Sequence, residues 1–355
     1  MTEREARADV PASGADLARV TARSLFYTCP PLEEATLPGG RAYLAHGTRL
    51  GSDVDAVVCI GAFDGVHVGH RALVAAALED ARRRGCACVA VTFDPDPADL
   101  LVGERASSRL LEVADRVRAI ATLGVDAVVV LDFGPGLAGT PYREFVASTL
   151  DSVVRPVSIH VGTNFRFGAR GEGDVAALAA IGRAQGFEAH AHELVTAGGQ
   201  PVSATRIRAL LHQGKVGEAS RLLDRLHWVR GVVEHGRGEG TSFGFPTANV
   251  RVPRVACMPA DGVYACVVCD GASAWPAAAN VGAPPTFSAP EEAFLEANLL
   301  GFDGDLYGSE VSVLFVRWLR ASRPFSSTAE LERVVLGNID WVRKNLGDRG
   351  VGVRS

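Results

Sequence analysis

The sequence predicts two domains of different class, an α/β domain followed by a smaller all-β domain. Its 355 residues exceed the usual size of a single domain. Between residue 54 and about residue 212, short apolar runs alternate with helical stretches, which is typical of a parallel sheet covered by helices. After His227 the apolar runs are separated by Gly, Pro and Asp, a pattern typical of an antiparallel barrel.

The α/β domain is expected to alternate strands and helices in order along the chain. Its strands read as continuous apolar runs because parallel strands are buried on both faces. The expected strands are residues 56–63, 86–93, 125–133 and 157–165, and the expected helices are residues 70–85, 115–124, 141–150 and 174–186. In such sheets ligands bind at the carboxyl ends of the strands.

The β domain is expected to be a small antiparallel barrel with a terminal helix. Its strand-like runs are residues 228–236, 262–270, 274–282, 294–302 and 311–319, and the helix is residues 327–346. The predicted organisation is a disordered extension over 1–24, a first domain over 25–212, a linker helix over 213–226 and a second domain over 227–347.

Composition argues against nucleic acid or a membrane as the main partner. The net charge is −5 with a pI of about 6.0, and there is no long basic run. No apolar stretch approaches the roughly 20 residues that span a bilayer, and the charged N-terminus does not resemble a signal peptide. The seven scattered cysteines are predicted to be small buried hydrophobic residues in a reduced cytoplasm. The oligomeric state stays open, with a homo-oligomer as one alternative.

The segment GAFDGVHVGH, residues 61–70, carries the first candidate site. His67 and His70 lie where a strand ends and a helix begins, and three interpretations compete: metal ligands, phosphate ligands, or turn residues without a function. Free N–H groups at a helix N-terminus attract anions, and imidazoles can donate to phosphate oxygens. Gly69 would let the backbone approach the ligand. A zinc site would need a third ligand that this motif lacks, so phosphate is favoured.

The segment SATRIR, residues 203–208, is a second candidate phosphate cradle. Ser203 and Thr205 stand at a helix start, and Arg206 and Arg208 follow in its first turns. Capping and solvation explain such residues equally well when they occur alone. Together with the histidines they predict a phosphate site, because the arginine fork matches phosphate geometry.

The segment GFPTAN, residues 244–249, follows a glycine-rich stretch. Glycines such as Gly244 allow a flap to fold over phosphates, while Thr247 and Asn249 offer oxygen ligands to a hard cation such as Mg²⁺. The alternative is a simple turn that enters a strand.

These motifs, in their order, resemble those of prokaryotic bifunctional riboflavin kinase/FAD synthetases. GAFDGVHVGH resembles the family signature, VGTNFRFG (161–168) and SATRIR resemble later adenylyltransferase motifs, and PTAN and LEANLL resemble the flavokinase module. The resemblance spans about residues 50–345. It implies a Rossmann-like nucleotidylyltransferase domain that converts FMN to FAD and a flavokinase-like barrel that converts riboflavin to FMN. ATP would be the co-substrate of both reactions and Mg²⁺ the metal.

The resemblance also implies residue roles. His67 and His70 would hold ATP phosphates, and Glu296 would be the base that takes the proton of the ribityl hydroxyl. Thr247 and Asn249 would bind Mg²⁺. The other residues expected at ATP are Gly61, Phe63, Asp64, Gly65, Gly69, Ser203, Thr205, Arg208 and Gly244, and those expected at the flavin are Asn164, Phe165 and Phe325. Phe63, Phe93 and Phe165 border adenine or flavin in this interpretation, with core packing as the alternative.

Several positions depart from the family pattern. Asp96 stands where a histidine is usual, Ala204 replaces a common serine, and Thr241 stands where arginine is frequent. These departures weaken the expected adenylyltransferase site. Two alternatives therefore accompany the bifunctional enzyme: a riboflavin or flavin-analogue kinase with a weakened first module, and a flavin-binding regulator without catalysis.

Overall fold

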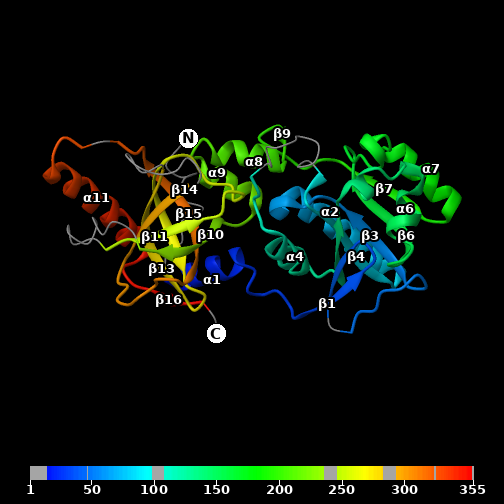
Figure 1. Cartoon of the computed structure of the whole chain (residues 1–355), viewed down its shortest axis with the longest axis horizontal. Helices are drawn as coiled ribbons and strands as arrows, with labels where there is room; N and C mark the ends of the chain where they lie inside the picture. Colours follow the sequence, from blue (N-terminus) through cyan, green and yellow to red (C-terminus); the bar gives the residue numbers. More distant parts are fainter. Residues whose placement is uncertain are drawn as a thin grey trace. The chain divides into compact units, whose positions relative to one another are not determined.

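The computed structural model of the chain describes residues 14–45, 47–97, 108–235, 246–282, 293–323 and 325–353. The chain divides into two compact units, which are described separately (Figure 1). The α/β unit comprises residues 28–107 and 111–203, and the barrel unit comprises residues 1–27, 108–110 and 204–355. Within the described ranges no helix is long and apolar enough to cross a membrane.

A mixed seven-stranded sheet runs through the α/β unit in the order β1-β2-β5-β4-β3-β6-β7. The last five strands in this order are parallel, whereas β2 is antiparallel to both of its neighbours. The strands are β1 (Leu32–Leu37), β2 (Gly40–Ala45), β3 (Asp55–Ile60), β4 (Ala87–Asp94), β5 (Ala127–Asp132), β6 (Arg155–Gly162) and β7 (Glu188–His192).

The hairpin β1–β2 and strand β7 were not predicted, and the sheet is therefore mostly rather than wholly parallel. Strand β1 exposes Glu33, Glu34 and Thr36, as edge strands commonly do to avoid pairing with other chains. Strand β7 reads EAHAH and lies at the opposite edge. Neither segment has the apolar run by which the central strands were recognised.

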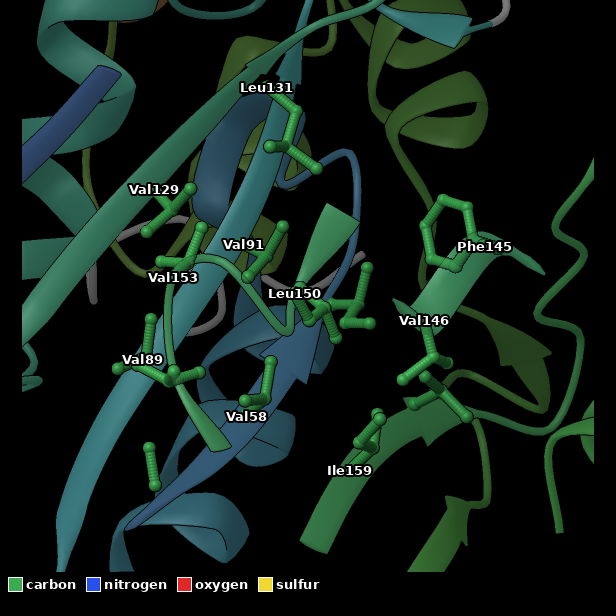
Figure 2. Packing of buried hydrophobic residues seen from close by; sticks show 14 of the residues in the cluster. Val58, Val89, Val91, Val129, Leu131, Phe145, Val146, Leu150, Val153 and Ile159 are labelled. Atoms are coloured by element: carbon green, nitrogen blue, oxygen red, sulfur yellow. The ribbon is translucent and has the colours of Figure 1, made fainter. Parts of the chain in front are cut away.

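Helices contact the sheet on both faces. They are α2 (Val68–Arg84), α4 (Val113–Ala121), α5 (Pro135–Ala138), α6 (Tyr142–Thr149) and α7 (Val175–Gln185). Figure 2 shows Val58, Val89, Val91 and Ile159 of the sheet in one apolar cluster with Phe145 and Val146 of α6. Side chains alternate along a strand, so Val57 and Cys59 point to the other face, where α2 contacts β3, β4 and β6.

The barrel unit contains six antiparallel strands in the order β12-β15-β10-β11-β14-β13, closed by pairing of β13 with β12. The short strand β16 (Val351–Gly352) adds to β13. The barrel strands are β10 (His227–Glu234), β11 (Ala248–Val252), β12 (Gly262–Cys269), β13 (Ser273–Val281), β14 (Ala293–Leu299) and β15 (Glu310–Arg320). Helix α11 (Thr328–Leu346) follows, capped by Ser327. The predicted barrel with a terminal helix is confirmed.

Residues 14–24, which we expected to lie in a disordered extension, instead form helix α1 (Gly14–Ser24) in the barrel unit. Leu17, Thr21 and Ser24 are buried at helical spacing. The carbonyl oxygen of Ser24 accepts a hydrogen bond from the indole N–H of Trp228 at 2.9 Å. The hydroxyl oxygen of Ser24 accepts a hydrogen bond from the backbone N–H of Leu226 at 3.1 Å. The helical spacing of these buried residues was not recognised in the sequence because two of the three residues are polar.

Helices α8 (Ala204–Leu211) and α9 (Val216–Leu223) also belong to the barrel unit. Helix α9 contacts both β10 and β15. The division between the units therefore falls between Ser203 and Ala204, within the SATRIR motif.

Candidate functional site

The turn between β3 and α2 is wound tightly around buried residues. Phe63, Gly65 and Val66 all have positive φ angles, of 53°, 76° and 41°. Positive φ is strained for a β-branched residue such as Val66 and persists only where the surroundings hold it in place, often at functional sites. Phe63 is fully buried and packs edge-on against His70, with ring centroids 5.2 Å apart.

His67 and His70 form a stacked pair at the N-terminus of α2. Their ring centroids are 3.7 Å apart. His67 caps the helix, because its Nδ1 accepts the backbone N–H of His70 at 3.4 Å. The proton of a neutral His67 therefore lies on Nε2. A Cβ atom on Gly69 would lie 3.1 Å from His67 Cε1, so this glycine makes room for the imidazole ring.

Burial favours the neutral form of both imidazoles. Burial lowers the pKa of His67 to about 4. Burial also lowers the pKa of His70 well below its usual value, helped by the nearby His67 and Arg116. Within the described part of the chain, the buried Nδ1 of His70 has no hydrogen-bond partner. Since buried polar atoms are nearly always paired, this atom is where a ligand is expected.

Arg116 of α4 is a buried cation beneath the same turn. Sequence analysis did not identify this residue. Its Nη1 donates to the carbonyl oxygen of Ala62 at 2.6 Å and to Thr92 Oγ1 at 3.3 Å. Asp64 is also buried, and its Oδ1 accepts the backbone N–H of Leu111 at 3.1 Å. In the sequence Arg116 looks like an ordinary polar residue of an amphipathic helix, so no local signal identifies it.

Asn164 and Phe165 follow β6, the parallel neighbour of β3. The carboxyl ends of neighbouring parallel strands meet at one edge of the sheet, so these residues share that edge with the turn at Gly61. Asn164 is exposed, and Phe165 is stacked on Phe167 with centroids 5.5 Å apart. Phe93, in contrast, is buried in the core, which supports the core-packing alternative for this residue.

The chain passes from one unit to the other within the predicted SATRIR cradle. Ser203 lies in the α/β unit. The carbonyl oxygen of Val202, the residue before Ser203, lies 3.9 Å from the position that a Cβ atom on Gly69 would occupy. Thr205 and Arg208 lie in the barrel unit. Thr205 is exposed, and Arg208 Nε donates to the carbonyl oxygen of Ser108 at 2.6 Å.

The barrel brings Asn249, Glu296 and Asn280 into one row on neighbouring strands. Asn249 of β11 is directly opposite Glu296 of β14, and Glu296 is directly opposite Asn280 of β13. Directly opposite residues project from the same face of a sheet. Their neighbours Leu295 and Ala297 are fully buried, so the row lies on the outer face of the barrel, where all three side chains are half-buried. Sequence analysis did not identify Asn280.

Two further predicted residues lie near this row. Thr247, half-buried, immediately precedes β11. Ser322 Oγ donates to Asn280 Oδ1 at 2.9 Å, which ties the residues just after β15 to β13. The guanidinium groups of Arg320 and Arg323 lie 5.4 and 4.9 Å from the centre of the Phe325 ring. Gly244 and Thr241 lie outside the described residues.

Comparison with known proteins identifies both modules. Residues 51–206 match the FAD synthetase family model, and residues 223–346 match the riboflavin kinase family model. The bifunctional riboflavin kinase/FMN adenylyltransferase of Escherichia coli K12 is 35% identical over 277 residues, covering 78% of this chain and 88% of the relative. The chain belongs to the bifunctional riboflavin kinase/FMN adenylyltransferase family.

Other relatives agree in length and fold. The bifunctional riboflavin kinase/FMN adenylyltransferase of Pseudomonas fluorescens is 35% identical over 287 residues, covering 81% of this chain and 92% of the relative. A crystal structure described as a macrolide-efflux protein from Streptococcus pneumoniae superposes with a TM-score of 0.75 at 30% identity, covering 83% of this chain and 95% of that chain.

Membership in the bifunctional family establishes the function predicted from the motifs. The protein has riboflavin kinase and FMN adenylyltransferase activities and makes FMN and FAD, with ATP and flavins as substrates. The predicted fold class is confirmed as well, with the sheet corrected to mostly parallel.

Proposed function

We propose that the N-terminus of α2 binds the ATP phosphates during FMN adenylylation, with His67 and His70 as donors. The observation that carries this is the buried, unpartnered Nδ1 of His70, stacked against the ring of His67 within the described region. His67 donates through Nε2, because its Nδ1 already accepts the N–H of His70. The N–H groups of the neutral imidazoles and the free N–H groups of the helix N-terminus can all donate to an anion.

In this proposal the phosphate oxygen of FMN attacks the α-phosphorus of ATP. A bond forms between that oxygen and the phosphorus, and the bond to the bridging oxygen breaks as pyrophosphate leaves. Catalysis is then positioning and neutralisation of the negative charge that develops on the phosphates. Gly61, Gly65 and Gly69 shape the turn, Asp64 anchors it through Leu111, and Arg116 places a buried positive charge beneath it.

Ser203, Thr205 and Arg208 stay predictions as residues that bind ATP phosphates. Thr205 is exposed in the first turn of α8, and Arg208 Nε donates to the carbonyl oxygen of Ser108. Asn164 and Phe165 are proposed to contact FMN, since they lie at the strand edge that carries the histidine turn. Asp96 follows β4, the other neighbour of β3, and would place a carboxylate at the same edge.

In the barrel we propose that Glu296 is the general base of the kinase. It would take the proton of the ribityl 5′-hydroxyl as that oxygen attacks the γ-phosphorus of ATP and ADP leaves. Thr247 and Asn249 would bind Mg²⁺, and their hydroxyl and amide oxygens fit a hard cation that keeps several waters and phosphate oxygens as further ligands. When bound, this ion would neutralise charge on the phosphates. Phe325 is proposed to border the flavin ring.

The two half-reactions can be assayed separately on the full chain. Riboflavin with MgATP tests the barrel site, and FMN with MgATP and pyrophosphatase tests the α/β site, with the flavins separated by chromatography. Substitutions in one site should spare the other reaction. If Glu296→Gln and His70→Ala depressed both reactions equally in folded protein, the assignment of residues to two sites would be wrong.

The place of action and the assembly state are also proposals. We propose that the protein works in the cytoplasm, which its seven free cysteines support because free thiols persist in a reducing compartment. A homo-oligomer stays a prediction that light scattering of the purified protein would test.

A further inference from the structure

A cluster of histidines and one aspartate lies on the α2 side of the sheet, away from both proposed sites. His160 of β6 is the register partner of His190 of β7, and their ring centroids are 4.7 Å apart. Asp80 of α2 reaches the same place, with its Oδ2 3.1 Å from His160 Nε2. One donor atom from each of these three residues lies within 4.8 Å of the other two.

The geometry of the cluster follows from the fold. Two histidines in register on neighbouring parallel strands must point to the same face, and α2 packs across that face. Asp80 stands ten residues after His70 on this helix, which is roughly 15 Å along its axis at 1.5 Å per residue. The cluster is therefore separate from the histidine pair at the start of α2.

We propose that Asp80, His160 and His190 bind a divalent transition metal ion, with Zn²⁺ as the best fit. Two imidazoles and one carboxylate form a common zinc ligand set. The nitrogen donors disfavour Mg²⁺, which prefers oxygen ligands. The side chains of Asp80 and His160 are only 2% and 4% exposed, whereas that of His190 is 37% exposed. The ion therefore enters on the His190 side, where a water can complete its coordination.

The surrounding side chains orient these donors as partners of metal-binding histidines do. His160 Nδ1 lies 2.9 Å from His192 Nε2, so His160 binds the ion through Nε2 while its Nδ1–H donates to His192. His190 Nε2 lies 3.1 Å from Glu188 Oε2, which fixes the orientation of that ring. Arg83 and Arg84 both donate to Asp80 Oδ1, which leaves Oδ2 facing the histidines.

The competing explanation is a hydrogen-bonded network that only ties α2 to β6. Ser158 Oγ donates to Asp80 Oδ2 at 2.5 Å and also lies 3.1 Å from His160 Nε2, so the network is satisfied without an ion. The two explanations differ in what His190 contributes. It is essential to the metal site, but it makes no hydrogen bond to Asp80 in the described structure.

The test is a titration of the full chain, freed of metal by chelation, with Zn²⁺ against a chromophoric chelator and without ATP. We expect one site, weakened at least tenfold by His190→Ala and by His160→Asn. His235→Ala removes an exposed histidine of the barrel unit and should leave the affinity unchanged. Co²⁺ should give visible absorption bands in the wild type that His190→Ala abolishes, and a thousandfold excess of Mg²⁺ should not displace Zn²⁺.

Absence of a Zn²⁺ site, or an affinity that is the same in the wild type and His190→Ala, would overturn the proposal in favour of the hydrogen-bonded network. Because His190 is partly exposed, this variant should fold even if His160→Asn does not. Far-ultraviolet circular dichroism of each variant checks the fold.

Discussion

Asn249 of β11 and Glu296 of β14 are direct cross-strand partners on the outer face of the barrel. Residues 47 positions apart in the chain thus present an amide oxygen and a carboxylate side by side. In the proposed kinase site, this juxtaposition would let the metal ligand and the base both reach the hydroxyl and the γ-phosphate.

Replacing Glu296 by glutamine should lower FMN formation by about 10²–10⁴-fold, the usual contribution of a general base. The amide keeps the shape of the side chain but cannot accept the proton. Conversion of FMN to FAD should persist. Glu310→Gln is the matched control, since Glu310 is an exposed strand glutamate that pairs with Arg230 at 3.3 Å. A Glu296→Gln kinase rate within about threefold of wild type, roughly 0.6 kcal/mol of barrier, would contradict the assignment.

Asn280 should act as a positioning residue through its hydrogen bond with Ser322. Asn280→Ala releases the residues just after β15, which precede Phe325 in the chain, and we expect the KM for riboflavin to rise by about 2- to 12-fold, the range for loss of one hydrogen bond. Ser322→Ala should have the same effect, and the double variant should be no worse than either single one. Additive effects in this cycle would show that the two residues act independently.

Replacing His70 or His67 by alanine should lower FMN adenylylation by about 10- to 150-fold, the range for one hydrogen bond to a charged group. Phosphorylation of riboflavin by the same variant is the internal control, because both histidines lie in the α/β unit. Steady-state rates for each half-reaction measure the effect. An unchanged adenylylation rate in His70→Ala would remove the basis of the proposed phosphate site.

The barrel unit should lose stability in mild acid because of His227. Burial lowers the pKa of this histidine to about 3, and its Nε2 lies 2.7 Å from the carbonyl oxygen of Cys257. The unfolded chain takes up a proton below about pH 6.5 and the folded chain does not, so stability is full above that pH and falls as the pH drops towards 3. Between pH 6.5 and 5 the expected loss is about 2 kcal/mol.

Urea unfolding followed by tryptophan fluorescence measures this effect, since Trp228, Trp275, Trp318 and Trp341 all lie in the barrel unit. His227→Gln can keep a donor towards Cys257 without titrating. Its unfolding should therefore depend less on pH than that of the wild type. Identical pH profiles would exclude His227 as the cause.

Introducing the family residues Asp96→His and Ala204→Ser together should lower the KM for ATP in FMN adenylylation and leave the kinase unchanged. A carboxylate near ATP phosphates repels them by roughly 1 kcal/mol when screened, which corresponds to about fivefold in affinity. Ala204, the first residue of α8, lacks the hydroxyl that a serine would offer. The effect should be largest at low salt. No change in KM would mean that neighbouring residues compensate for both departures.

Local patterns in the sequence identified most elements and both chemical modules. Apolar runs such as that of β3 reveal a central strand because burial on both faces requires them, and the order of the motifs places the adenylyltransferase before the kinase. The elements that local patterns missed contain polar residues where an apolar pattern was sought. They are the edge hairpin β1–β2, strand β7, and helix α1 with its buried Thr21 and Ser24. Ser24, for example, is paired with Leu226 and Trp228, which are distant in sequence, and no local period records such partners.

The composition of each candidate site was decided by tertiary structure. Arg116 becomes a buried cation only because α4 brings it to the carbonyl oxygen of Ala62, 54 residues earlier in the chain. Asn280 joins Glu296 only through the β13–β14 register, and His160 meets His190 only through the β6–β7 register. Strand register depends on the packing of the whole sheet, and a shift of one residue in these pairings would turn Asn280 or His190 to the opposite face.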